Sequence, residues 1–168
     1  MKIKSEKYLY LSIFIMILLF ISSSMTYKEQ SSVPFLQKYL TSQPFKDILS
    51  QVSFSYGHSV ISIKEVGYYK FVEFFIRKLA HFSTYFVMGL GFYMTLKDNL
   101  KKWQATFFSY LAAVGYAGID EFHQMITGDR TPSFEDVMLD GIGALTGIII
   151  TMVILYFFRR KNNIINIL

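Results

Sequence analysis

Apolar and polar positions alternate in long blocks along the chain, and four blocks are nearly free of charge. They cover residues 8–25, 79–96, 103–121 and 137–158. About 20 mostly apolar helical residues cross a bilayer core of about 30 Å, so each block has the length of a transmembrane helix. The pattern predicts an all-α, polytopic membrane protein whose four-helix transmembrane bundle forms one domain over residues 1–168.

Three groups of basic residues flank the apolar blocks and predict their orientation. If all four blocks span, the groups lie on one side, which the positive-inside rule makes cytoplasmic. We therefore expect a multi-pass protein of the cell membrane with cytoplasmic N- and C-termini and outward loops at residues 26–78 and 123–135. The basic residues are Lys2, Lys4, Lys7, Lys97, Lys101, Lys102, Arg159, Arg160 and Lys161.

The first apolar block allows a second interpretation. Its lysine-rich start, the apolar run over residues 8–21 and the small residues Ser22, Ser23 and Ser24 also describe a secretory signal peptide. A small-x-small cleavage site followed by a polar mature start is poorly defined, which favours a retained helix. Cleavage stays open as an alternative, and the other three helices keep their placement in either case.

The long outer loop, residues 26–78, carries its own structural signals. Phe45, Ile48, Leu49 and Val52 recur at helical spacing after Pro44, which predicts a short amphipathic helix on the bilayer surface. Aromatic residues between positions 68 and 75 resemble an interfacial belt before the second span. We interpret the loop as a packed cap without a ligand, and His58 beside Gly57 as a turn residue without chemistry.

Composition narrows the possible functions. The chain has no cysteine, which excludes disulfides, thiolate metal sites and cysteine nucleophiles. It carries 17 basic against 12 acidic residues, but several of the basic ones adjoin apolar blocks. They act as topology signals, so we expect the lipid bilayer as a partner and no nucleic acid.

Ionisable residues gather at one depth, the outer ends of the second, third and fourth blocks. Singly, each has a structural explanation, such as packing for His81 or the helix dipole for Asp136. Charge within hydrocarbon is costly unless it is paired or wetted, so clustering at one depth favours a shared outward-facing polar pocket. Its candidate residues are Lys78, His81, Tyr85, Asp120, Glu121, His123, Gln124, Arg130, Asp136 and Asp140.

Small residues predict which face of the fourth helix is packed. Gly143 and Gly147 form a Gly-x-x-x-Gly pair on the same stripe as Asp136 and Asp140. Such pairs let a neighbouring helix approach closely, so the face with the aspartates should contact other helices. The opposing surfaces are expected from Gly89, Gly91, Gly115 and Gly118.

These motifs together resemble the VanZ-like family of membrane proteins. The resemblance rests on Arg77-Lys78-Leu79-Ala80-His81-Phe82 with Tyr85, on Asp120-Glu121-Phe122-His123-Gln124, and on Arg130, Asp136, Gly143 and Gly147. It covers about residues 71–150 and implies a bacterial envelope membrane protein linked to resistance against the glycopeptide teicoplanin. This chain has Thr84 where the family commonly has an acidic residue, and Asp140 where it often has asparagine.

Three functions remain open from the sequence. The first is binding, in which the pocket engages an envelope lipid, a lipid-linked cell-wall precursor or the lipoglycopeptide itself, with no cofactor. The second is a metal-dependent interfacial hydrolase or transferase with His81, Glu121, His123 and Asp136 as candidate ligands, although no His-Glu-x-x-His spacing occurs. Whether the protein is an enzyme therefore stays open, and a transporter with aspartate relays ranks last.

Overall fold

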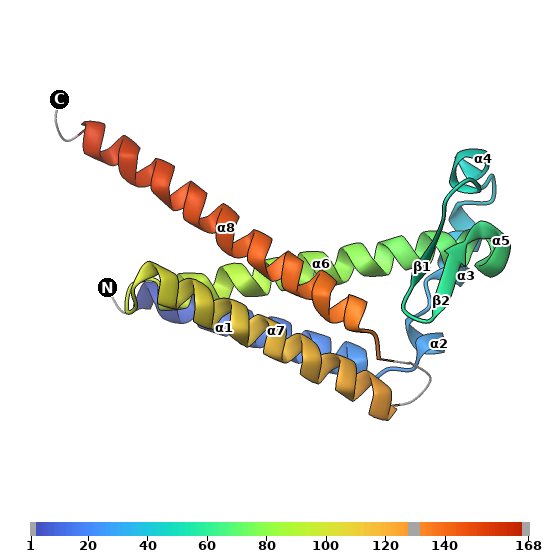
Figure 1. Ribbon diagram of the computed structural model, residues 1–168, viewed down its shortest axis with the longest axis horizontal. Helices are drawn as coiled ribbons and strands as arrows, with labels where there is room; N and C mark the ends of the chain where they lie inside the picture. The colour runs from blue at the N-terminus through green and yellow to red at the C-terminus, as the bar shows by residue number, and fades with distance from the viewer. Residues whose placement is uncertain (1–2, 128–131, 166–168) are drawn as a thin grey trace.

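Four long helices form the body of the protein in a computed structural model, which describes residues 3–127 and 132–165, with side chains from 5 to 160 within those ranges. They are α1 (Ile3–Ser23), α6 (Tyr68–Leu96), α7 (Lys102–Thr127) and α8 (Phe134–Ile165). Figure 1 shows α8 crossing α6 and then extending away from the other helices, with the outer loop gathered around the start of α6. The structure is therefore mostly helical.

The long helices continue past the apolar blocks that predict them. The second block begins at residue 79, whereas α6 begins at Tyr68, directly after Gly67 with φ of +81°. At 1.5 Å per residue, the 29 residues of α6 extend about 44 Å, well beyond a hydrocarbon core of about 30 Å. The first turns of α6 can therefore support structures outside a membrane.

The outer loop is not all helical, which corrects the all-α prediction. It contains α2 (Tyr27–Gln30), α3 (Val33–Tyr39), α4 (Lys46–Leu49) and α5 (Ile63–Val66), and also a hairpin of β1 (Ser53–Tyr56) and β2 (Ser59–Ser62). The strands pair antiparallel from Ser53↔Ser62 to Tyr56↔Ser59. Alternating serine with aromatic or branched residues, and Gly57 at φ +56° in the turn, explain the hairpin.

The predicted amphipathic surface helix is also much shorter than expected. Its helical part, α4, has four residues and excludes Val52. Gln43 and Phe45 both adopt positive φ, of 46° and 59°, on either side of Pro44. This left-handed backbone prevents a longer helix from starting at the proline, and apolar periodicity alone gave no sign of it.

Close approach of α6 and α8 organises the bundle. A Cβ added at Gly147 would collide with the backbone carbonyl of Phe86, and one at Gly143 with that of Phe82. Glycines at both positions therefore allow the two helix backbones to touch, as small residues do at membrane helix contacts.

The other glycines divide between contacts and open surface. Gly89 faces the backbone of Ala144 on α8, while Gly91 faces Ser12 on α1. Gly115 and Gly118 have no neighbouring atom within 4 Å of an added Cβ, so the expectation that they supply a packing surface is wrong. A pair of glycines in a helix therefore indicates a helix contact only where another helix packs against that face.

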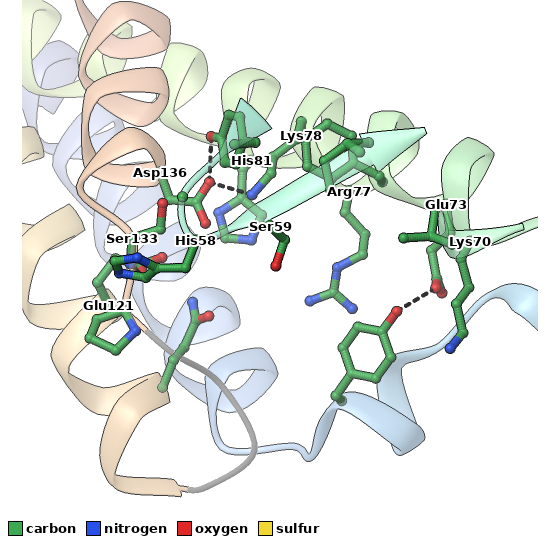
Figure 2. A pocket seen from close by; sticks show the side chains of 18 residues that line it. His58, Ser59, Lys70, Glu73, Arg77, Lys78, His81, Glu121, Ser133 and Asp136 are labelled. Carbon is green, nitrogen blue, oxygen red and sulfur yellow. Dashed lines mark hydrogen bonds and ion pairs between the residues drawn. The ribbon is translucent and has the colours of Figure 1, made fainter. Parts of the chain in front are cut away.

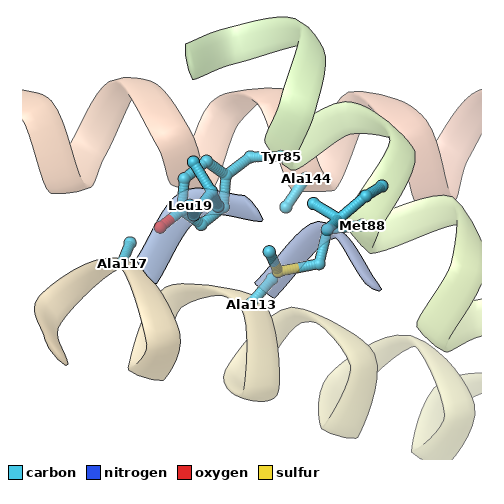
Figure 3. Packing of buried hydrophobic residues seen from close by; sticks show 7 residues of the cluster. Leu19, Tyr85, Met88, Ala113, Ala117 and Ala144 are labelled. Carbon is cyan, nitrogen blue, oxygen red and sulfur yellow. The ribbon is translucent and has the colours of Figure 1, made fainter. Parts of the chain in front are cut away.

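The core lies where all four helices meet. Tyr85 and Met88 of α6 are fully buried there, against the alanines of α7 and α8 (Figure 3). The small alanine side chains leave room for the two large ones, as dense packing requires. The buried cluster comprises Ile15, Leu19, Tyr85, Met88, Ala113, Ala117 and Ala144.

Polar residues face inward and large apolar residues face outward. On α7, for example, Phe107, Leu111 and Ile119 are more than half exposed. Such a surface suits lipid, because water-soluble monomers rarely expose large contiguous apolar patches. The buried polar residues of the four long helices include Ser12, Ser23, Glu73, Ser109, Asp120, Glu121, Gln124, Asp140 and Thr151.

Two helices are long and apolar enough to cross a membrane, among the residues that the structure describes. They cover Ser5–Ser23 in α1 and Phe134–Arg160 in α8. Helices α6 and α7 are long enough but contain more polar residues. The two apolar helices and the outward apolar surface indicate a membrane-associated protein.

Candidate functional site

A cavity of about 380 Å³ lies where the outer loop meets α6, α7 and α8. Five of the sequence-predicted pocket residues line it: Lys78, His81, Glu121, Gln124 and Asp136. Figure 2 shows side chains from the helices and from the loop around this space. The structure thus brings polar groups from three long helices to one cavity.

Lys78 and Asp136 form an ion pair on the cavity wall, between α6 and α8. The hydroxyl of Tyr56, from the hairpin, donates to the same Asp136 oxygen at 2.6 Å, and the Lys78 ammonium lies 4.6 Å from the centre of the Tyr56 ring. Burial, together with the hydrogen bond to Asp136, raises the pKa of Tyr56. Tyr56 therefore stays protonated and fastens the hairpin to both helices.

His81 contacts Asp140 deeper in the cavity wall. Its Nδ1 lies 3.4 Å from Oδ2 of Asp140, whose side chain is 1% exposed. The other Asp140 oxygen has no hydrogen-bond partner among the described residues. An imidazole oriented by a carboxylate can exchange a proton with a bound molecule, so the pair gives the cavity one acid–base group.

The end of α7 supplies the opposite wall. Glu121 accepts a hydrogen bond of 2.9 Å from the backbone N–H of Ser133, which ties α7 to the start of α8. Gln124 lines the cavity and donates to Asp120 at 2.9 Å, while Ser23 of α1 donates to the other Asp120 oxygen. Asp120 consequently lies behind the wall, as a connection from α7 to α1.

Other predicted pocket residues lie elsewhere. Tyr85 is fully buried in the core, because its position on α6 faces α7 and α8. His123 stacks on Phe20 of α1, with ring centroids 4.5 Å apart. Neither residue lines the cavity, which corrects the prediction for both, and Asp140 reaches it only through His81. Arg130 lies outside the described residues.

The residues of the outer loop that complete the cavity were not predicted to line it. His58 occupies a turn, as predicted, and it also lines the cavity, which was not predicted. Lys70, Phe74, Arg77 and His81 follow each other at intervals of four, three and four residues, a helical face that was visible in the sequence. The residues missed are Tyr27, Tyr56, His58, Lys70, Glu73 and Arg77.

Glu73 anchors the outer loop to α6 and is 1% exposed. It accepts a hydrogen bond from the Tyr27 hydroxyl at 3.0 Å and bonds from both the backbone N–H and the hydroxyl of Ser32. Burial alone would raise the pKa of this carboxyl, but the hydrogen bonds outweigh it and hold the pKa below its ordinary value. The charge of Glu73 is thus stabilised by neutral donors of the loop.

Comparison with known proteins identifies the family of the chain. A family model described as VanZ/LLP1 matches residues 8–157, which include most of all four long helices and the whole outer loop. The chain belongs to the VanZ/LLP1 family. No curated protein and no solved structure matches it.

Metal ligation finds little support in this VanZ/LLP1 site. Within the described parts of the chain, no three His, Asp or Glu side chains converge as a ligand set. Of the candidates, Asp136 is held by Lys78, Glu121 accepts from a backbone N–H, and His123 stacks on an aromatic ring. Charged and aromatic side chains are thus what the cavity presents to a bound molecule.

The Glu73 anchor predicts a pH-dependent attachment of the loop. Because the folded pKa lies below the unfolded value of about 4.3, the anchor contributes fully above that value and is lost as pH falls through the folded pKa. At neutral pH, Glu73→Gln should mimic the acid form and lower amide protection over residues 27–39. Hydrogen exchange measures this, with the exposed Glu65→Gln as control. Equal protection in both variants would contradict the anchor.

Proposed function

We propose that this VanZ/LLP1 protein is a multi-pass envelope protein in which all four long helices span the membrane, with both termini cytoplasmic. The basic residues Lys97, Lys101 and Lys102 lie at the turn between α6 and α7, and Arg159 and Arg160 lie towards the end of α8. These segments are at the end of the bundle away from the cavity (Figure 1). The positive-inside rule then turns the cavity outward.

We further propose that the cavity binds a lipid-borne component of the cell envelope, and that this binding contributes to teicoplanin resistance. The observation that carries the proposal is the cavity itself, whose walls combine charged and aromatic side chains from three membrane helices and from the outer loop. Ligand sites commonly have this character, an apolar enclosure with a few placed polar groups. In the proposed orientation it opens near the membrane surface.

In this proposal, teicoplanin resistance arises because the protein and the antibiotic compete for lipid-borne components at the outer surface of the membrane. A lipid-tailed glycopeptide concentrates at the membrane and acts on lipid-linked cell-wall precursors. A protein that holds such a lipid-borne component at the outer surface alters how the antibiotic meets its target. This role needs no catalysis, which agrees with walls whose acidic groups are already engaged by the protein.

Filling the cavity tests the proposed function. Ser59 lines the cavity on the strand face shared with Tyr56, so Ser59→Trp should occupy the space with little effect on the bundle. Most of the teicoplanin resistance conferred by the wild-type protein should then be lost. Ser55→Trp, on the opposite face of the same hairpin and also exposed, is the matched control.

Minimum inhibitory concentrations at matched expression give the readout. Vancomycin, measured in parallel, shows whether the effect is restricted to teicoplanin. Wild-type resistance in the Ser59→Trp strain, with the protein folded and present in the membrane, would count against the proposed function.

A further inference from the structure

Two cations on α6 point towards the open part of the cavity without an acidic partner. Lys70 and Arg77 are two helical turns apart on the face of α6 that lines the cavity, and Figure 2 shows both side chains extending to the same side. The described residues give neither of them an ion pair with Asp or Glu. They are therefore candidates for binding an anion from outside the protein.

Among the described residues, the acidic groups of the cavity form no ion pair with these cations. Glu73 lies between them in sequence, but both of its oxygens accept from Tyr27 and Ser32. Asp136 is engaged by Lys78, and Glu121 accepts from a backbone N–H at the far wall. The three carboxylates are thus held by partners in the cavity wall, whereas the side chains of Lys70 and Arg77 extend into the cavity.

Arg77 is also held in position. Its guanidinium carbon lies 5.1 Å from the centre of the Tyr27 ring, and its Nη2 donates to Oε1 of Gln30 at 3.1 Å. A guanidinium has five N–H donors in a planar fork that matches phosphate geometry. Tyr27 and Gln30 orient this fork from one side, and most of its donors are left for a ligand.

The position of these residues along α6 indicates the kind of anion. The apolar block of α6 begins at Leu79, so at 1.5 Å per residue Arg77 lies about 3 Å, and Lys70 about 13 Å, beyond the hydrocarbon along the helix axis. The polar headgroup layer is roughly 5–8 Å deep on each side of a bilayer. Arg77 lies at its level, and Lys70 lies about 5–8 Å beyond its outer edge.

We infer that Arg77 and Lys70 bind the phosphate of a lipid headgroup in the outward cavity. The inference rests on the proposed function and names the chemistry of its ligand. Arg77 supplies the oriented fork, Lys70 adds a second charge farther out, and the aromatic walls cover the rest of the headgroup. The same two residues could take phosphate from a lipid or from solution, which the test separates.

The experiment measures binding to the full-length protein in mild detergent. The probes are short-chain phosphatidic acid, a diacylglycerol with the same chains but no phosphate, and inorganic pyrophosphate. Arg77→Gln should weaken phosphatidic acid binding at least about tenfold, and the more exposed Lys70→Ala roughly threefold to tenfold. Lys64→Ala, an exposed lysine on α5 outside the cavity, should leave binding unchanged.

Each outcome decides something. Equal affinity for phosphatidic acid and diacylglycerol, or wild-type affinity in both Arg77→Gln and Lys70→Ala, would overturn the inference. Pyrophosphate binding with the same sensitivity to the variants supports a phosphate site that free phosphate can fill, and binding of the lipid alone supports a headgroup site. If Arg77→Gln does not fold, the exposed Lys70→Ala still tests the site.

The two proposals can fail separately. Phosphate binding that depends on Arg77, together with unchanged teicoplanin resistance in Ser59→Trp, would reject the proposed function and keep the phosphate site. Loss of teicoplanin resistance in Ser59→Trp, together with no phosphate binding by the wild-type protein, would keep the proposed function and reject the phosphate site.

Discussion

Gly147→Ala is expected to destabilise the bundle by about 1–3 kcal/mol, the usual cost of overpacking. The added methyl group would collide with the carbonyl oxygen of Phe86, a backbone atom that cannot rotate away as a side chain can. Helices α6 and α8 would have to separate, and their contact is the most extensive in the bundle. Unfolding of the purified protein by sodium dodecyl sulfate in mixed micelles measures the change in free energy.

Gly118→Ala is the matched control for that substitution. It also replaces a glycine by alanine in a long helix, but an added Cβ at Gly118 meets no atom within 4 Å. Alanine favours helix by up to about 1 kcal/mol over glycine, so the control should be neutral or stabilising. Similar free energies of unfolding for the two variants would mean that the backbones of α6 and α8 are not in contact at Gly147.

The contrast between Gly147 and Gly118 shows what sequence could and could not predict about the fold. The four hydrophobic blocks predicted the four long helices, since each block has about the 20 apolar residues of a helix that could span a bilayer. Gly143 and Gly147 lie on the same face of α8 as Asp136 and Asp140, and this pattern correctly predicted the packed face of the helix. The glycines of α7 carry the same local signal, but nothing in the sequence says whether another helix covers them.

The sequence predicted a site residue correctly where the residue has both the right depth along its helix and a helix face that turns towards the cavity. Lys78 and His81 lie at the start of the second apolar block, and Asp136 lies at the start of α8. Their helix faces turn inward, so helical spacing brings them to one cavity. Tyr85 has the right face but lies too deep, and His123 turns towards α1. The spacing of residues in the sequence shows which of them share one face of a helix. Which neighbouring helix that face contacts depends on the packing of the whole protein.

The outer loop was beyond prediction for a different reason. Its contributions to the cavity come from residues far from their partners in sequence, such as Tyr56 with Asp136 and Tyr27 with Glu73. Short polar strands and single-turn helices leave weak periodic signals, and their arrangement depends on these long-range hydrogen bonds. From the sequence alone, the loop is therefore interpreted as a cap without a ligand. Its contribution to the cavity becomes visible only when its side chains are placed against α6.

His81→Ala should be among the most destabilising substitutions in the cavity, at about 3–5 kcal/mol. Asp140 is 1% exposed, and His81 provides its hydrogen bond among the described residues. Removing the imidazole leaves a buried carboxylate without the hydrogen-bond partner that His81 provides. Asp140→Asn removes the charge with the same shape, and its amide oxygen can still accept from His81, so it should cost much less.

The double variant His81→Ala/Asp140→Asn separates stability from function. It should recover much of the stability lost in His81→Ala, because no buried carboxylate is left to desolvate, and the double-mutant cycle gives the coupling free energy directly. Simple addition of the two single effects would show that the residues do not interact. If resistance is still lost in the stabilised double variant while Asp140→Asn keeps it, the imidazole acts on the ligand in the cavity. If resistance returns with stability, His81 serves to hold α6 against α8, and the cavity binds through its other walls.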